Sequence, residues 1–280
     1  MKFMPAQTNG VYLMENQGWE YSLVSQWREN NHGTIIGFPH STVRFWDLRY
    51  FFDQSMFQVN NMEKSEFPAI PDKVAVNGTN TRKSLTRGCW PRERLEEVEA
   101  LRFLYLGRAH KKKLCPDGTR EQTRLLVLGD YVQENTNQLL SVLRDSSEDF
   151  PENVHVTFKP HPNCPVISGE AVTGIPMQVT NNDIEHLLSA NDIVFTSNLT
   201  SAAVDAYCYG LKVISLNGGR GMNLSPLRNE DNVDFIHDSK GFLNALTHVV
   251  ASQRYYPGGP EAVFFNVDAG LLGWKALLNV

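Results

Sequence analysis

The chain has 280 residues, with 26 Lys and Arg against 31 Asp and Glu and a formal net charge of −5. Its 41% hydrophobic and 20% charged residues are ordinary globular values, which exclude a disordered, collagen-like or coiled-coil chain. Because single domains usually span about 100–200 residues, the length predicts two α/β domains or one large one. The acidic balance argues against a nucleic-acid-binding protein, since the longest basic run is Lys111-Lys112-Lys113.

The cysteines Cys89, Cys115, Cys164 and Cys208 are scattered and contain no C-x-x-C pair. This spacing is typical of reduced thiols and predicts neither a disulfide framework nor a zinc site. The N-terminal residues lack the apolar core of a signal peptide, and no segment reaches the roughly 18 apolar residues of a membrane span. We therefore expect a cytoplasmic protein.

The first half of the chain is irregular. It predicts strands over 11–14, 34–38 and 73–76 and helices over 19–30 and 93–106. An aromatic-rich stretch over 43–57 is expected mainly to pack in the interior, with a stacking platform for a sugar as the alternative. Three strands are few for an independent domain of this class, so we expect a small or incomplete N-terminal domain, or a fragment of a longer protein.

The second half alternates short apolar strands with helices. Strands are predicted over 124–129, 155–159, 192–196 and 211–216, and helices over 134–144, 183–190, 201–209 and 241–251. Such alternation predicts a doubly wound, Rossmann-like parallel sheet, whose ligands bind beyond the carboxyl ends of the strands. The basic segment Gly107–Arg120 is the expected boundary, giving an N-terminal α/β domain over 1–112 and a nucleotide-binding domain over 113–280.

Polar side chains gather at two predicted strand ends in the second domain. The run KPHP (159–162) ends one strand, and the run TSNLTS (196–201) connects another strand to a helix. The first N–H groups of a helix have no partner within it and favour an anion, so a phosphate site is expected here. The alternative is that the hydroxyls cap the helix and the histidine braces a turn. The residues of the predicted site are Lys159, His161, Ser197, Asn198, Thr200 and Ser201.

A glycine-rich loop, Gly218–Asn223, follows the strand over 211–216. Its Arg220 would hold a phosphate or a sugar carboxylate, although a surface turn explains the loop equally well. The chain contains no G-x-x-x-x-G-K-[ST], G-x-G-x-x-G or H-E-x-x-H motif, which argues against a P-loop NTPase, a standard dehydrogenase and a zincin. It also contains no D-x-D motif, which disfavours a metal-dependent transferase.

The HP pair and the serine-rich turn resemble the C-terminal domain of GT-B glycosyltransferases that use CMP-activated 2-keto sugars, namely bacterial sialyltransferases and Kdo transferases. The runs ENQGWE (15–20), GFPHSTVRFWDLRYF (37–51), AVNG (75–78) and VEALRFLYL (98–106) are similar to a family of bacterial surface-carbohydrate biosynthesis proteins. This similarity covers most of the chain. It implies a GT-B-like fold and a metal-independent glycosyltransferase of surface polysaccharide, such as capsule or lipopolysaccharide, without a cofactor.

The resemblance also assigns roles to residues of the second domain. His161 would contact and protonate the departing CMP phosphate, which Ser197, Thr200 and Ser201 would bind together with the amides around Asn198. Glu185 is the best match to the glutamate that holds the ribose hydroxyls, although it lies closer to the serine motif than in those enzymes. The segment Ile175–Met177 would line the cytosine pocket.

A base must also receive the proton of the acceptor. Glu15 and His40 follow the first two predicted strands and are equally good candidates, and Asp47, farther into the aromatic stretch, ranks third. Asp47 could instead pair with Arg44 or Arg49, and His40 could brace the following turn. Each of the three has a structural alternative.

Three functions remain open at this point. The first is transfer of Kdo or a nonulosonate from its CMP donor to a glycan or glycolipid acceptor. Such a transferase would act in the cytoplasm or peripherally at the inner membrane, and other polysaccharide-assembly enzymes are its expected partners. The second is a polyol-phosphate transferase of the CDP-glycerol type. The third is a non-catalytic nucleotide-binding scaffold.

Overall fold

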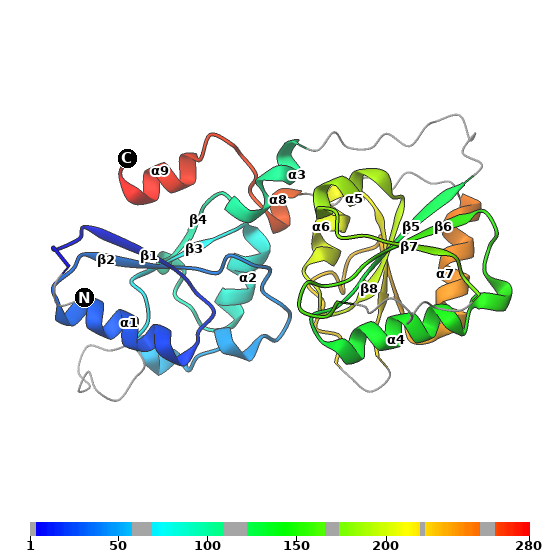
Figure 1. Cartoon of the computed structure of the whole chain (residues 1–280). Helices are drawn as coiled ribbons and strands as arrows, with labels where there is room; N and C mark the ends of the chain where they lie inside the picture. The colour runs from blue at the N-terminus through cyan, green and yellow to red at the C-terminus, as the bar shows by residue number, and fades with distance from the viewer. Residues whose placement is uncertain (1–3, 58–68, 109–121, 166–173, 219–221, 253–260) are drawn as a thin grey trace. The chain divides into compact units, whose positions relative to one another are not determined.

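The computed structural model describes residues 4–57, 69–108, 122–165, 174–218, 222–252 and 261–280. The chain divides into two compact units, each built around its own parallel β-sheet (Figure 1). Unit 1 comprises Met1–Gly107 and Pro260–Val280, and unit 2 comprises Arg108–Gly259.

The sheet of unit 1 has four parallel strands in the order of the chain. They are β1 (Asn9–Leu13), β2 (Thr34–Phe38), β3 (Lys73–Val76) and β4 (Leu95–Glu97). The first three coincide closely with predicted strands, whereas β4 lies in the segment 93–106 that the sequence predicts to be a helix. There Val74 pairs with Leu95, and both side chains are buried. The pairing with β3 thus overrides the helical preference of a glutamate-rich segment. The remainder of the segment forms short turns and α3 (Leu104–Arg108).

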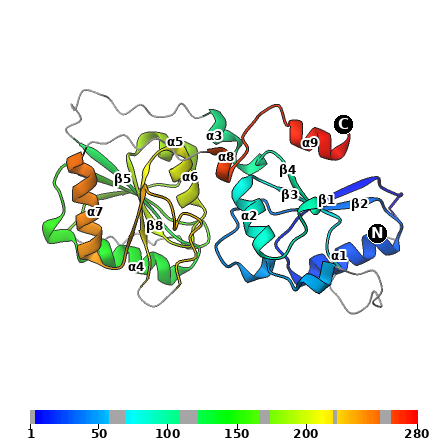
Figure 2. The ribbon, with the colours of Figure 1, turned by 180° about the vertical axis from the view of Figure 1, so that it is seen from behind.

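Helices cover both faces of this sheet. The helices α1 (Gly18–Glu29) and α2 (Thr79–Arg87) lie on one face and α9 (Leu272–Leu278) lies on the other (Figure 2). On the α1 face Trp27 packs with Ile35, and on the α9 face Trp274 meets Phe38 edge to face with 5.0 Å between ring centroids. Each face therefore has its own apolar contacts.

The C-terminal segment packs on unit 1, whereas the sequence predicts it as part of the second domain, over 113–280. Unit 1 also ends its first segment at Gly107, shortly before the predicted boundary at residue 112. Here α8 (Glu261–Phe264) contacts α2, and α9 is held by the buried carboxylate of Glu99. Glu99 accepts hydrogen bonds from the backbone N–H groups of Gly273 (2.8 Å) and Trp274 (3.1 Å). A carboxylate at a helix N-terminus satisfies amides that have no partner within the helix, which fixes α9 on this sheet.

Part of the aromatic stretch packs in the interior, as predicted. Phe52 and Phe57 each lie 5.3 Å from Trp90 between ring centroids, and the Tyr50 hydroxyl donates to the carbonyl oxygen of Met14. Trp46 differs, since 52% of its surface is exposed. The stretch therefore contributes packing and leaves one ring open to solvent.

Unit 2 contains a six-stranded parallel sheet in the order β10-β9-β8-β5-β6-β7. Its strands are β5 (Thr123–Leu128), β6 (Val154–Lys159), β7 (Met177–Val179), β8 (Ile193–Ser197), β9 (Lys212–Leu216) and β10 (Val233–Ile236). The helices between them are α4 (Gln133–Arg144), α5 (Ile184–Ala190), α6 (Ala202–Tyr209) and α7 (Ser239–Ser252). This confirms the doubly wound sheet predicted from the alternating pattern, with β7 and β10 added at its edges.

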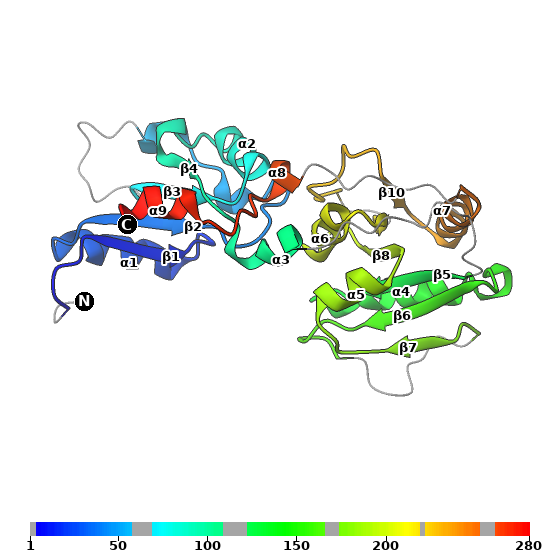
Figure 3. The same ribbon diagram turned by 90° about the horizontal axis from the view of Figure 1, so that it is seen from above.

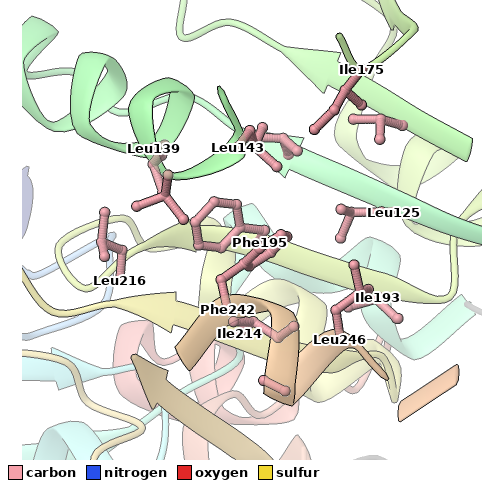
Figure 4. Close-up of a cluster of buried hydrophobic side chains, with 14 of the residues drawn as sticks. Leu125, Leu139, Leu143, Ile175, Ile193, Phe195, Ile214, Leu216, Phe242 and Leu246 are labelled. Atoms are coloured by element: carbon pink, nitrogen blue, oxygen red, sulfur yellow. The ribbon is translucent and has the colours of Figure 1, made fainter. Parts of the chain in front are cut away.

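Apolar side chains fill the space between this sheet and the helices α4 and α7. Figure 4 shows Leu139 and Leu143 of α4 and Phe242 of α7 closing on Phe195 of β8. Phe195 and Phe242 are fully buried, and their ring centroids lie 4.5 Å apart. The helices α5 and α6 cover the opposite face of the sheet (Figure 1). No helix in the described ranges is long and apolar enough to span a bilayer.

We expect the Glu99 contact to contribute measurably to the stability of unit 1. Replacing Glu99 by Ala leaves the N–H groups of Gly273 and Trp274 without a partner, which costs about 1–3 kcal/mol. The measurement is the free energy of unfolding in denaturant. Glu96→Ala is the matched control, because its ion pair with Lys73 is exposed and is worth under about 1 kcal/mol. Equal losses in the two variants would contradict this account of α9.

Stability should also fall at alkaline pH. Burial raises the pKa of Tyr50 and Tyr12 well above the ordinary value, with the charge of Glu20 adding to both shifts. The unfolded chain releases these protons near pH 10. Stability is therefore full below about pH 10 and falls as pH rises toward the folded pKa. A pH series of unfolding should show a smaller alkaline loss in Tyr50→Phe, and identical slopes would refute the assignment.

Candidate functional site at the carboxyl ends of the strands

The strand order of unit 2 reverses between β5 and β8. From β5 the chain passes through α4 to β6 and β7, and it returns through α5 to β8 on the other side of β5 (Figure 3). Such a reversal separates the loops that follow the two strands and leaves room for a ligand at their carboxyl ends. The loops that begin at Gly129 and at Ser197 flank this point.

A buried hydrogen bond joins the two loops. The hydroxyl of Ser197 donates to the Oδ2 atom of Asp130, and the Ser197 oxygen accepts from the N–H group of Leu199 at 3.3 Å. Asp130 is fully buried and Ser197 is 4% exposed. Ser197 thus braces the turn between β8 and α6, and its proton is directed away from solvent.

The rest of this turn divides into a tied part and an open part. The Asn198 side chain donates to Oδ1 of Asn217 at 2.9 Å, and its backbone N–H donates to the Leu216 carbonyl oxygen at 3.1 Å. The N–H groups of Thr200 and Ser201 have no acceptor in the part of the chain that the structure describes. Both residues are half-buried. These two N–H groups are the groups of the turn that remain open for an anion.

Three of the other helices that follow strands, α1, α4 and α7, have a carboxylate bound to N–H groups near their start. Asp130 accepts from the N–H of Val132 ahead of α4 at 2.8 Å, and Asp238 accepts from the N–H of Gly241 in α7 at 2.7 Å. In unit 1 the carboxylate of Glu20 occupies three amides before α1 at 2.9–3.1 Å. At the start of α6 the described residues place no carboxylate on the N–H groups, so an external anion meets no bound carboxylate there.

His161 lies in a tight turn after β6. Its carbonyl oxygen accepts from the N–H of Cys164 at 2.9 Å, and its Nδ1 atom accepts from the N–H of Asn163 at 3.2 Å. Because Nδ1 uses its lone pair, the neutral ring carries its proton on Nε2. Gly129 allows the two loops to approach, since a Cβ atom there would lie 3.0 Å from the His161 nitrogen. His161 is therefore a fixed donor beside the end of β5.

Two other predicted residues, Lys159 and Glu185, lie outside the α6 turn. The Lys159 ammonium group donates to the carbonyl oxygen of Asn182 at 2.7 Å, so it ties the loop after β7. Glu185 is exposed at the start of α5, and its charge adds to burial in raising the pKa of Tyr209. Arg220 lies outside the described residues, and Ile175 belongs to the buried core. Besides Asp130, a second buried carboxylate lies near the turn: Asp205, in the first turn of α6, is 7% exposed.

Three groups beside the turn were not predicted from the sequence, namely Asp130, Asn217 and His237. Asn217 follows β9, and its carbonyl oxygen accepts from Nδ1 of His237 at 2.9 Å after β10. A carbonyl oxygen only accepts, so Nδ1 of His237 carries the proton. Recognition of the short strand over 233–236 would have placed His237 at this edge, and the Gly-Asp pair after the strand over 124–129 would have indicated Asp130.

The predicted bases of unit 1 lie together at one edge of its sheet. Leu13 pairs with Phe38 in register, and Glu15 and His40 each lie two residues farther along. His40 is half-buried, and its Nδ1 atom has no partner among the described residues. Asp47 is paired with Arg49 at 2.7 Å, as its structural alternative predicts.

No group of three or more His, Cys, Asp or Glu side chains in the described ranges has the geometry of a metal site. The candidate site therefore consists of the open amides of the α6 turn and the Nε2–H group of His161 in unit 2, with the predicted bases Glu15 and His40 in unit 1.

Neither a protein-family model nor a curated protein matches the chain. Solved structures do. HepE of Anabaena in complex with UDP-glucose has a TM-score of 0.54 at 11% identity, covering 98% of this chain and 79% of that chain. Staphylococcus aureus MnaA with UDP has a TM-score of 0.61 at 13% identity, covering 98% and 76%. UDP-GlcNAc 2-epimerase from Neisseria meningitidis, bound to UDP-GlcNAc, has a TM-score of 0.60 at 9% identity, covering 96% and 84%.

These similarities confirm the GT-B-like fold of two parallel-sheet α/β domains. At such low identity they bear on the fold alone. The closer resemblance to sialyltransferases and Kdo transferases stays a prediction.

The tautomer of His161 can be measured directly. Nitrogen-15 NMR of the full chain near neutral pH should show a bare Nδ1 and a protonated Nε2, because the N–H of Asn163 faces Nδ1. His237 should show the opposite tautomer and serves as the internal control. A protonated Nδ1 in neutral His161 would contradict the geometry of this turn.

Proposed function

We propose that the chain is a glycosyltransferase that takes a sugar from a pyrimidine nucleotide donor bound to unit 2. The observation that carries the proposal is the α6 turn, where the N–H groups of Thr200 and Ser201 stay open beside the reversal of strand order. Backbone amides fixed at a helix N-terminus stabilise a phosphate without reorganisation.

His161 would supply the proton in this proposal. Its Nε2–H group is the donor that remains after Nδ1 is occupied, and it lies after β6, next to the end of β5. A proton donated to the departing phosphate neutralises the charge that develops as the glycosidic bond breaks. The base that receives the acceptor proton is proposed to be Glu15 or His40 at the edge of unit 1.

The finer proposal for the donor is a CMP-activated 2-keto sugar, Kdo or a nonulosonate, which rests on the sequence resemblance. A UDP-sugar is the rival donor, because the similar structures were solved with UDP, UDP-glucose or UDP-GlcNAc. A UDP-sugar epimerase is the second candidate function, favoured by the similarity to UDP-GlcNAc 2-epimerase from Neisseria meningitidis. An epimerase converts its donor with no acceptor present, whereas a transferase requires one.

Titration with CMP, CDP, UDP, GDP and ADP tests the proposal. A ligand bound only by the folded chain stabilises it by roughly 2.7 kcal/mol at a hundredfold excess over Kd, so thermal unfolding and calorimetry report selectivity. Selective stabilisation by CMP supports the CMP-activated keto-sugar donor, and selective stabilisation by UDP supports a UDP-sugar donor. A preference for CDP favours the polyol-phosphate transferase, and no response to any nucleotide would refute the proposal.

Two variants locate the site. His161→Ala should weaken binding of the preferred nucleotide by roughly tenfold, about one charge-assisted hydrogen bond. Ser197→Ala should also weaken it, because the α6 turn then loses its tie to Asp130. His155→Ala is the matched control, because His155 is an exposed histidine of β6, the strand that precedes His161. Full affinity in both site variants would place the nucleotide elsewhere.

A further inference from the structure

Asp130 is a buried carboxylate for which the proposed reaction has no use. It is fully buried directly beyond β5, and its Oδ1 atom accepts from the N–H of Val132 at 2.8 Å. Its Oδ2 atom accepts from the hydroxyl of Ser197. Burying a charge costs free energy unless hydrogen bonds compensate it. The carboxylate of Asp130 is nevertheless buried beside a site proposed for an anion, which calls for a physical explanation.

The direction of the hydrogen bond decides what Ser197 can do. A carboxylate only accepts, so the proton of the Ser197 hydroxyl points to Asp130. The Ser197 oxygen accepts in turn from the N–H of Leu199. The hydroxyl therefore has no proton to donate to a phosphate.

The backbone of Asp130 is itself anchored. Its N–H donates to Oγ1 of Thr136 at 2.9 Å, and the Thr136 hydroxyl donates to the Asp130 carbonyl oxygen at 3.2 Å. Thr136 is fully buried in α4. Through Asp130, the turn that begins at Ser197 is thus tied to α4.

We infer that Asp130 is a positioning residue of the proposed phosphate site: it holds the Ser197 proton away from the ligand and anchors the turn, leaving the phosphate to the backbone N–H groups of Thr200 and Ser201. This inference rests on the proposed function and assigns a part to a residue that is not among the predicted site residues. The negative charge of Asp130 also opposes the bound anion, which limits affinity for the released nucleotide.

The inference predicts opposite effects for two substitutions. In Asp130→Asn the amide oxygen still accepts from Val132, and its NH₂ group donates to the Ser197 oxygen. The Ser197 proton then becomes free for the phosphate, and the buried negative charge is gone. In Asp130→Ala the charge is removed as well, but both side-chain ties are lost, and we expect the loss of the anchor to outweigh the loss of the charge.

The experiment is calorimetric titration of the full chain with CMP and UDP and with the phosphate-free nucleosides cytidine and uridine. Asp130→Asn should bind the preferred nucleotide roughly tenfold more tightly, because the Ser197 hydroxyl can then donate to the phosphate. Asp130→Ala should bind it roughly tenfold more weakly, because the turn that holds the donors is no longer anchored; each change is about the size of one charge-assisted hydrogen bond. Nucleoside affinity should change in neither. Asp192→Asn is the control, because Asp192 accepts from the N–H of Arg124 at 3.0 Å at the opposite end of β5 and β8.

Nucleotide affinity unchanged in both Asp130 variants would overturn the inference while the proposed function stands. Weaker binding by Asp130→Asn, or an equal loss for nucleotides and nucleosides, would overturn it as well, because these outcomes report a general loosening of unit 2. A wild-type chain that binds no nucleotide contradicts the proposed function and the inference together. If Asp130→Ala does not fold, the sign of the change in Asp130→Asn decides.

Discussion

The hydrogen bond between Ser197 and Asp130 is the interaction on which the candidate site depends. The reversal of strand order separates the loops after β5 and β8, and loops free to separate would not hold a fixed set of donors. The buried bond closes that separation from inside the unit, where water does not compete with it. Rigid placement of amides is what makes a helix N-terminus useful for binding charge that develops during a reaction.

The turn before α1 in unit 1 differs from the α6 turn of unit 2 in the partners of its N–H groups. Both units place a strand, a turn and a helix in sequence, which is the arrangement that binds phosphates in many α/β proteins. In unit 1 the Glu20 carboxylate already accepts from the N–H groups of Glu15, Asn16 and Gln17. Those three N–H groups are therefore already occupied, whereas the N–H groups of Thr200 and Ser201 have no acceptor among the described residues. The two turns differ in whether their N–H groups already have a partner.

Much of the fold could be predicted from the sequence, because buried parallel strands appear as short apolar runs with clear ends. The strands β2 and β3 have the predicted bounds, and the helix α6 differs by one residue. Short strands such as β7 carry too few residues for a pattern, and their pairing with a neighbour decides their structure. The packing of α9 on unit 1 rests on Glu99, which lies 174 residues before Gly273, and no local pattern encodes so distant a contact.

The residue types of the candidate site and their place at strand ends could be predicted from the sequence, but the direction of their hydrogen bonds could not. A serine after a strand is equally consistent with a ligand that donates to phosphate and with a brace that donates inward, and the partner decides between them. Ser197 donates to Asp130, a residue 67 positions earlier, so in the proposed function the phosphate is left to the main chain. Main-chain donors recognise the shape and charge of a phosphate and do not distinguish one base from another. In the proposed function, the choice between CMP and UDP then falls to groups that contact the base.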